Sequence, residues 1–294
     1  MDKTKILKAG KIAGECKKFA RSIIKKDMLL LEIAEKIEGK IIELGGKIAF
    51  PISLAIDDIA AHYTPTHDDK TLAHGLLKVD LGVHIDGWIA DTAFSVDLEN
   101  SDENKKIIEV AEFALENASK IIKENISTDE IGQTIEDTIE SKKFSPVRNL
   151  SGHQIEHYDL HAGISIPNYN SGKNIKLPKG LYACEPFATN GSGRVYDGKP
   201  AGIYMLINSK NIRSPIAREV LKLIQEEYQT LPFCERWIVK KIGTKALFGL
   251  KQLEANGNLH HFTTLMESGK GKVAQAENTF LISENETIVT TRED

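Results

Sequence analysis

The chain has 294 residues, with Lys+Arg 38 against Asp+Glu 42, so its formal net charge is −4. Hydrophobic residues make up 41% and charged residues 27%, a composition typical of a globular protein that buries a full core. The near balance of charge excludes a strongly basic nucleic-acid-binding protein, and we expect no binding to DNA.

Compartment and membrane signals point to a protein that works in solution. Cys16, Cys184 and Cys234 are far apart, odd in number and without C-x-x-C spacing, which predicts a reducing cytoplasm and no thiolate zinc site. The most apolar early run, residues 28–31, is short and is interrupted by Glu32. We therefore expect neither a signal peptide nor a membrane span.

The N-terminal segment predicts two amphipathic helices. From Lys5 to Leu44 apolar residues recur at intervals of three and four, the pattern breaks near Asp27, and Gly45-Gly46 ends the second helix. These helices carry many lysines, which favours a solvated helix face. A surface that contacts ribosomal RNA is the less favoured alternative.

The segment around Asp86-Gly87 predicts a β-hairpin, because apolar and polar residues alternate on both sides of this two-residue turn. In the register that this turn imposes, Gly82 faces Asp91 and Asp80 faces Ala93. Asp80 and Asp91 are then diagonal neighbours on one face of the hairpin, with Cβ atoms within roughly 7–8 Å.

Two carboxylates this close on an otherwise apolar face repel each other and are costly to bury. A metal ion between Asp80 and Asp91 would remove the conflict. The alternatives are that the face is solvated or that an Arg or Lys pairs with the acids. The hairpin alone does not favour one of these explanations over the metal ion.

Further elements follow in chain order. Ser101 begins a predicted helix, and Ser127, with Glu130 placed for a capping box, begins another that runs to about Phe144. The segments 153–160, 180–188, 202–207 and 273–289 are strand-like. The helical block between the last two of these, residues 211–258, begins with Ser214-Pro215 and is interpreted as an insertion in a single α+β domain.

Three more side chains are candidates for a metal site. His153 lies at the start of a short predicted strand, Glu185 is a lone acid in an apolar stretch, and Glu277 has apolar strand-like neighbours. Carboxylates are rarely buried unpaired. With Asp80 and Asp91 they would form an oxygen-rich site with one imidazole, suited to two divalent ions.

Six segments together resemble one family. They are HYTPTHDD (62–69), KVDLGVHIDGWIADTAF (78–94), SGHQIEHYDLHAG (151–163), LYACEPFATNGSG (181–193), LPFCERW (231–237) and AQAENTF (274–280). In this order and spacing the chain resembles the archaeal-type type 2 methionine aminopeptidases of peptidase family M24. The resemblance implies that residues 1–294 form one pita-bread domain, two related α+β halves around two metal ions, with residues 211–258 as the helical insertion of type 2 members.

The resemblance also assigns roles to residues. Asp80 would be a bidentate ligand of one metal ion, Asp91 and Glu277 would bridge both ions, and His153 and Glu185 would complete the other site. Glu185 would also carry the proton from the attacking water to the leaving amine. The family's two non-ligand active-site histidines correspond to His62 and His161, and its methionine pocket to Phe50, Leu160 and Phe187.

The implied function is a cytoplasmic, monomeric metallo-aminopeptidase that removes the initiator methionine from nascent chains with a small second residue. It would use two divalent ions of cobalt, manganese, iron or zinc, and ribosome contact would be transient. A proline-specific peptidase is an alternative that the residues after His153 disfavour. A metal-free binding protein of the same fold is another, against which the five ligand positions argue. His260 and His261 receive no role.

Overall fold

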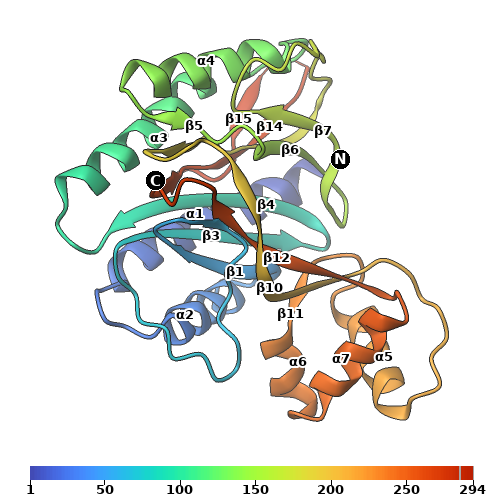
Figure 1. Cartoon of the computed structure of the whole chain (residues 1–294). Helices are drawn as coiled ribbons and strands as arrows, with labels where there is room; N and C mark the ends of the chain where they lie inside the picture. Colours follow the sequence, from blue (N-terminus) through green and yellow to red (C-terminus); the bar gives the residue numbers. More distant parts are fainter. Residues whose placement is uncertain (285, 294) are drawn as a thin grey trace.

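The computed structural model describes residues 1–284 and 286–293, and its elements follow one another as Figure 1 shows. The helices are α1 (Lys3–Ile23), α2 (Leu30–Glu43), α3 (Asp102–Ile121), α4 (Thr128–Ser141), α5 (Pro215–Glu227), α6 (Glu235–Ile242) and α7 (Ala246–Ala255). The longer strands are β1 (Lys47–Ile56), β3 (Leu76–Ile85), β4 (Trp88–Asp97), β6 (Ser151–Glu156), β7 (Asp159–Pro167), β10 (Val195–Leu206) and β12 (Leu259–Glu267). The shorter ones are β2 (Ile59–Ala61), β5 (Ser145–Pro146), β8 (Gly180–Cys184), β9 (Phe187–Thr189), β11 (Phe233–Cys234), β13 (Val273–Gln275), β14 (Asn278–Ile282) and β15 (Thr287–Val289).

The N-terminal half is a three-stranded sheet, in the order β1-β3-β4, covered by α1 and α2 (Figure 1). The apolar stripes predicted along both helices form its core, in which Ile33 and Ile37 are fully buried against strand residues such as Val79. The hairpin turn is as predicted, with Asp86 (φ 46°) and Gly87 (φ 83°) both in the left-handed region that a type I′ turn requires.

The second half repeats this plan with α3 and α4 beside a sheet of order β15-β14-β8-β6-β7 (Figure 1). Ser101 caps α3 by accepting from the backbone N–H of Asn104, and Ser127 and Glu130 form the predicted capping box of α4. This helix ends at Ser141, slightly before the predicted Phe144.

The predicted helical block contains α5, α6, α7 and the short strand β11, which share a core of their own. Ser214 caps α5 and Pro215 occupies its first turn, as expected. The block is connected to the halves through the sheet β11-β10-β12-β2, whose long strands β10 and β12 lead into and out of it (Figure 1).

Two strand predictions were wrong in their bounds, and Glu277, expected within a strand of the segment 273–289, lies outside one. The segment 153–160 is not one strand but the facing ends of β6 and β7, joined at His157-Tyr158. Tyr158 has φ 57°, a turn conformation that Gly and Asn usually adopt. Because tyrosine does not signal a turn, the sequence did not predict one here. The segment 180–188 is interrupted after Cys184, so Glu185 lies between β8 and β9. Glu277 lies between β13 and β14 in the same way. No strand was predicted at β1 or β12.

Candidate metal centre

A cavity of about 250 Å³ opens between the two halves, and every metal-ligand, catalytic and pocket residue predicted from the sequence lines it. The metal-ligand candidates in its lining are Asp80, Asp91, His153, Glu185 and Glu277. The remaining predicted residues that line it are Phe50, His62, Leu160, His161 and Phe187. These ten side chains come from segments more than 200 residues apart in the chain, and the fold brings all of them to one site.

The hairpin places its two acids as predicted. Asp80 pairs with Ala93 and Gly82 with Asp91, so the two carboxylates are diagonal neighbours. Ligand atoms of Asp91, His153 and Glu277 all lie within 4.8 Å of one another, and all three residues are buried. The cluster therefore has the size of a site for metal ions.

A second acid reaches the same imidazole. His153 Nε2 is 3.5 Å from Asp91 Oδ2 and 3.7 Å from Glu185 Oε1. Glu185 thus joins the cluster from the segment between β8 and β9.

Burial shifts the pKa of every ionisable group in the cluster toward its neutral form. It raises the pKa of Asp91 to about 7. Burial, and then repulsion by neighbouring acids including Asp91, holds the pKa values of Asp80, Glu185 and Glu277 well above their usual range. Burial also lowers the pKa of His153 to about 4, so its imidazole is neutral at pH 7. Four neighbouring acids with raised pKa values together with a neutral imidazole are suited to binding cations.

Unpartnered atoms test whether metal ions fit this cluster. Asp80 Oδ1, Asp91 Oδ1 and Glu277 Oε2 are buried and have no hydrogen-bond partner among the described residues. Buried polar atoms normally have partners, and hard divalent ions prefer carboxylate oxygens. The donor set and these three oxygens therefore fit divalent metal ions.

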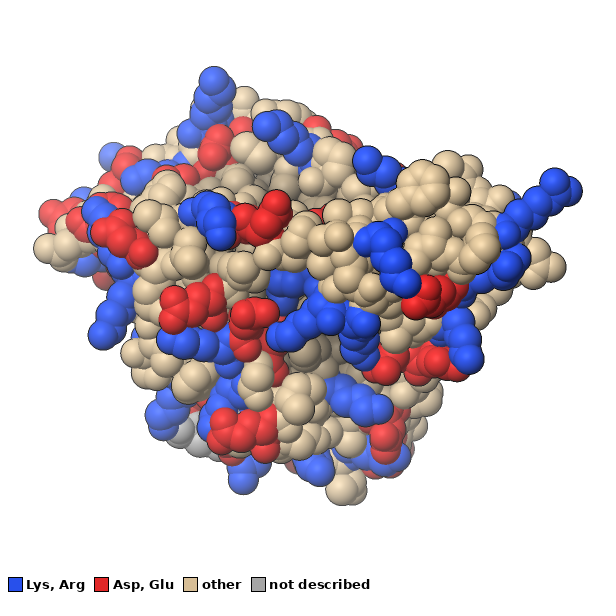
Figure 2. Space-filling model, turned by 90° about the horizontal axis from the view of Figure 1, so that it is seen from below, with Lys and Arg blue, Asp and Glu red and all other residues tan. Residues whose placement is uncertain are grey.

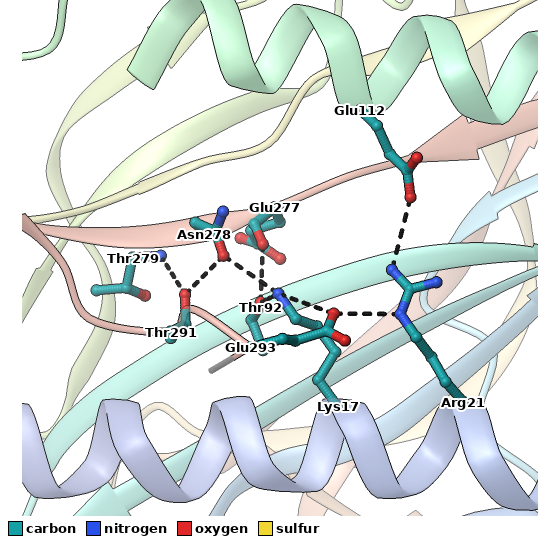
Figure 3. A network of polar contacts seen from close by, with 9 residues as sticks. All are labelled: Lys17, Arg21, Thr92, Glu112, Glu277, Asn278, Thr279, Thr291 and Glu293. Carbon is teal, nitrogen blue, oxygen red and sulfur yellow. Dashed lines mark hydrogen bonds and ion pairs between the residues drawn. The ribbon is translucent and has the colours of Figure 1, made fainter. Parts of the chain in front are cut away.

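A buried lysine contacts the segments that carry Thr92 and Asn278 (Figure 3). Lys17 of α1 is 6% exposed, and its Nζ donates to Thr92 Oγ1 at 3.1 Å and to Asn278 Oδ1 at 3.2 Å. Thr92 directly follows Asp91 and Asn278 directly follows Glu277. The Lys17 ammonium group therefore links the two residues that directly follow the candidate ligands Asp91 and Glu277.

Direct hydrogen bonds hold the same two segments together, although β4 and β14 belong to different sheets. Thr92 Oγ1 donates to Glu277 O at 2.7 Å, and the Glu277 N–H donates to Ala93 O at 3.0 Å. Thr279 Oγ1 donates to Asp91 O at 2.7 Å. The main chains of Asp91 and Glu277 are thereby fixed relative to each other.

The two non-ligand histidines both line the cavity. His62 has φ 63°, an uncommon conformation for this residue type, and its Nδ1 is 3.3 Å from Thr263 O. Because a carbonyl oxygen only accepts, Nδ1 carries the hydrogen and Nε2 of the neutral ring is an acceptor. His161 meets the His153 ring edge to face with centroids 4.4 Å apart, and burial lowers its pKa to about 3.

An apolar wall completes the cavity. Phe50 lies over Gly82, where an added Cβ would come within 2.2 Å of the ring, so only glycine fits under it. Further apolar side chains that were not predicted from the sequence also line the cavity, among them Ile203, Pro232, Phe262 and Leu265. The last two belong to β12, a strand that was not predicted, and Phe262 packs edge to face against His62.

Neither of the two histidines left without a role in the sequence analysis is among the residues that line the cavity. His260 is exposed and its ring packs against Phe262. His261 stacks on Tyr204 with centroids 4.0 Å apart and interacts with Glu254 through Nδ1.

Among the described residues, no helix combines the length and the apolar character needed to cross a membrane. The three cysteines are free and buried.

Comparison with known proteins gives a match over almost the whole chain. The model of metallopeptidase family M24 matches residues 4–284. A methionine aminopeptidase from Pyrococcus abyssi is 45% identical over 296 residues, which cover 99% of this chain and 100% of the relative.

Two solved structures are similar in fold at low sequence identity. A thermophilic Arx1 superposes with a TM-score of 0.85 at 15% identity, covering 98% of this chain and 90% of the other. A methionine aminopeptidase from Thermotoga maritima superposes with a TM-score of 0.71 at 20% identity, covering 100% and 98%. The expected pita-bread fold, with its two halves around one cavity, is confirmed.

Proposed function

The chain belongs to metallopeptidase family M24 and to the methionine aminopeptidases within it, and from this membership we propose how its cavity removes an N-terminal methionine. The observation that carries the proposal is the convergence of four acids, three imidazoles and an apolar wall in one cavity. The acids and His153 form a cation site, the other imidazoles can hold and polarise a peptide, and the wall can take an apolar side chain.

Asp80, Asp91, His153, Glu185 and Glu277 would hold two divalent ions, which supply a hydroxide near neutral pH and polarise the scissile carbonyl. Glu185 accepts the proton of the attacking water and passes it to the leaving amine. Its environment suits this role, because burial and the neighbouring acids raise its pKa well above that of an ordinary carboxyl group.

The histidines act on the peptide itself. His161 is neutral at pH 7 because burial lowers its pKa, and it donates a hydrogen bond to the oxyanion that develops on the carbonyl. His62 binds the peptide next to the scissile bond through Nε2, which is free to accept because Nδ1 is engaged with Thr263 O.

Phe50, Leu160 and Phe187 provide an apolar pocket for the methionine side chain. All three are buried around the cavity. Apolar pockets discriminate by roughly 1–3 kcal/mol per methylene, so selection of methionine depends on filling the space completely. The free α-amine would lie against the acids, which restricts cleavage to the first peptide bond.

The substrates we propose are nascent chains with a small second residue, processed in the cytoplasm. The buried free cysteines agree with a reducing compartment. We propose a monomer as the working form, since one chain carries all five candidate ligands. Contact with the ribosome would be transient, since Lys and Arg are interspersed with Asp and Glu on the face seen in Figure 2. The single domain with its helical insertion at residues 211–258 is proposed as the working unit.

Release of methionine from Met-Ala-Ser tests this function. Purified protein supplied with manganese or cobalt is expected to release methionine, and treatment with a chelator is expected to stop the reaction. The matched peptide Ala-Pro-Ser serves as the second substrate. Cleavage of this peptide in place of Met-Ala-Ser would identify a proline-specific enzyme, and no cleavage of either would favour a metal-free binding protein.

A further inference from the structure

One buried side chain touches two of the proposed ligands without being one itself. Gln275 is 1% exposed, and its Nε2 donates to Asp80 Oδ2 at 3.2 Å and to Glu185 Oε2 at 3.3 Å. Asp80 comes from β3 of the first half, and Glu185 follows β8 of the second. A single amide group therefore links an acid of the first half to an acid of the second.

The main chain of Gln275 is held firmly at the end of β13. The Gln275 N–H donates to Ser95 Oγ at 2.9 Å, and the Ser95 hydroxyl donates to the Gln275 carbonyl oxygen at 2.8 Å. The strand also pairs with β9, where Gln275 lies opposite Phe187. With its backbone fixed on both sides and its side chain buried, Gln275 has little freedom to turn its amide away from the acids.

The chemistry of the amide matches its position. Carboxylate oxygens only accept, and a primary amide has two hydrogens, one for each acid. The other oxygen of Asp80, Oδ1, has no hydrogen-bond partner among the described residues. The other oxygen of Glu185, Oε1, lies 3.7 Å from His153 Nε2. Gln275 thus holds one oxygen of each carboxylate and leaves the second oxygen available to a metal ion.

We propose that Gln275 is a positioning residue of the metal centre, which fixes one ligand from each half in its binding orientation before the ions arrive. This inference rests on the proposed function, because it takes Asp80 and Glu185 as metal ligands. A neutral donor suits the task, since a Lys or Arg in its place would repel the ions. Partners that orient metal ligands typically contribute 10–100-fold to metal affinity.

Titration of metal-free Gln275→Met with MnCl2 by calorimetry tests the inference. Methionine has a similar length but no hydrogen to donate, so the dissociation constant for Mn²⁺ is expected to rise about 10–100-fold. The visible absorption spectrum of the Co²⁺-loaded variant should also change, because it reports the arrangement of the ligands. A side chain that only fills space would leave both readouts unchanged.

Gln154→Met is the matched control. Gln154 directly follows the ligand candidate His153, but its Nε2 donates to the exposed Glu156 at 3.3 Å. The same substitution there is expected to leave the Mn²⁺ affinity within about twofold of the unmodified protein, since it removes no donor to a ligand.

The outcomes separate the inference from the function on which it rests. If the unmodified protein bound no Mn²⁺, the proposed function would be wrong. If it bound Mn²⁺ and folded Gln275→Met bound it equally well, the role of Gln275 would be wrong. Should Gln275→Met not fold, Gln275→Asn replaces it under the same criterion, because its amide is one methylene too short to reach both acids.

Discussion

Asp91→Asn is expected to lower kcat/KM for Met-Ala-Ser by about 1000-fold or more, which corresponds to about 4 kcal/mol of transition-state stabilisation. Asparagine keeps the shape of the side chain but loses the charge that a bridging ligand supplies. Asp91 is buried within the acid cluster, with 4% of its surface exposed.

The fold should tolerate this change. Burial raises the pKa of Asp91 to about 7, so the metal-free structure already disfavours the charge that the variant removes. Far-ultraviolet circular dichroism is therefore expected to match that of the unmodified protein. Asp102→Asn, at an exposed position on α3, is the control and should keep full activity. Full activity in Asp91→Asn would refute the assignment of this residue.

Arg236→Met is expected to destabilise the protein by about 3–5 kcal/mol and to lower Tm by roughly 10 °C. Arg236 of α6 donates to both oxygens of Glu38 on α2, at 2.7 and 2.8 Å, and also to Pro65 O at 3.1 Å. Trp237 Nε1 adds a bond to Glu38 at 3.1 Å. Both charges are almost fully buried, so removing the arginine leaves an unpaired carboxylate inside the protein.

A double variant separates the ion pair from simple packing. Glu38→Leu combined with Arg236→Met removes both charges and is expected to recover much of the lost stability, as apolar replacement of buried pairs often does. Lys245→Met breaks an exposed pair with Glu219 in the same helical block and should shift Tm by about 1 °C or less. An unchanged Tm for Arg236→Met would show that this pair does not anchor α6 to α2.

Much of the site followed from short-range patterns. The Asp86-Gly87 turn set a register that placed Asp80 and Asp91 as diagonal neighbours, and the structure has this register. Helix starts at Ser101, Ser127 and Ser214 were predicted for the same reason, since capping depends on a few adjacent residues.

What was missed depends on long-range contacts. Lys17 looked like one of many solvated lysines, yet it is buried beside Thr92, and its charge is 3.7 Å from Glu293 near the other end of the chain (Figure 3). Gln275 carries no metal-ligand signal because an amide is an ordinary strand-end residue, and only the fold brings it to Glu185. Periodicity within one segment cannot reveal such pairings.

The Tyr158 turn and β12 were missed for a related reason. A left-handed tyrosine is stabilised by its surroundings, here by a backbone bond to Gly87 O at 2.9 Å. In β12, His260, His261, Thr263 and Thr264 interrupt the alternation that predicts a strand, although the segment pairs with both β10 and β2. The resemblance to a family named the pocket residues Phe50 and Phe187, but it gave no equivalent for Phe262 on this strand.

Calorimetric titration of the metal-free protein with MnCl2 at pH 7, repeated in buffers of different ionisation enthalpy, tests the central claim that the acid cluster is a site for two metal ions. Two ions are expected to bind per chain, with net release of protons. Release follows because the raised pKa values of Asp80, Asp91, Glu185 and Glu277 leave protons on the cluster that the ions displace. Binding of fewer than two ions, or binding without proton release, would contradict it.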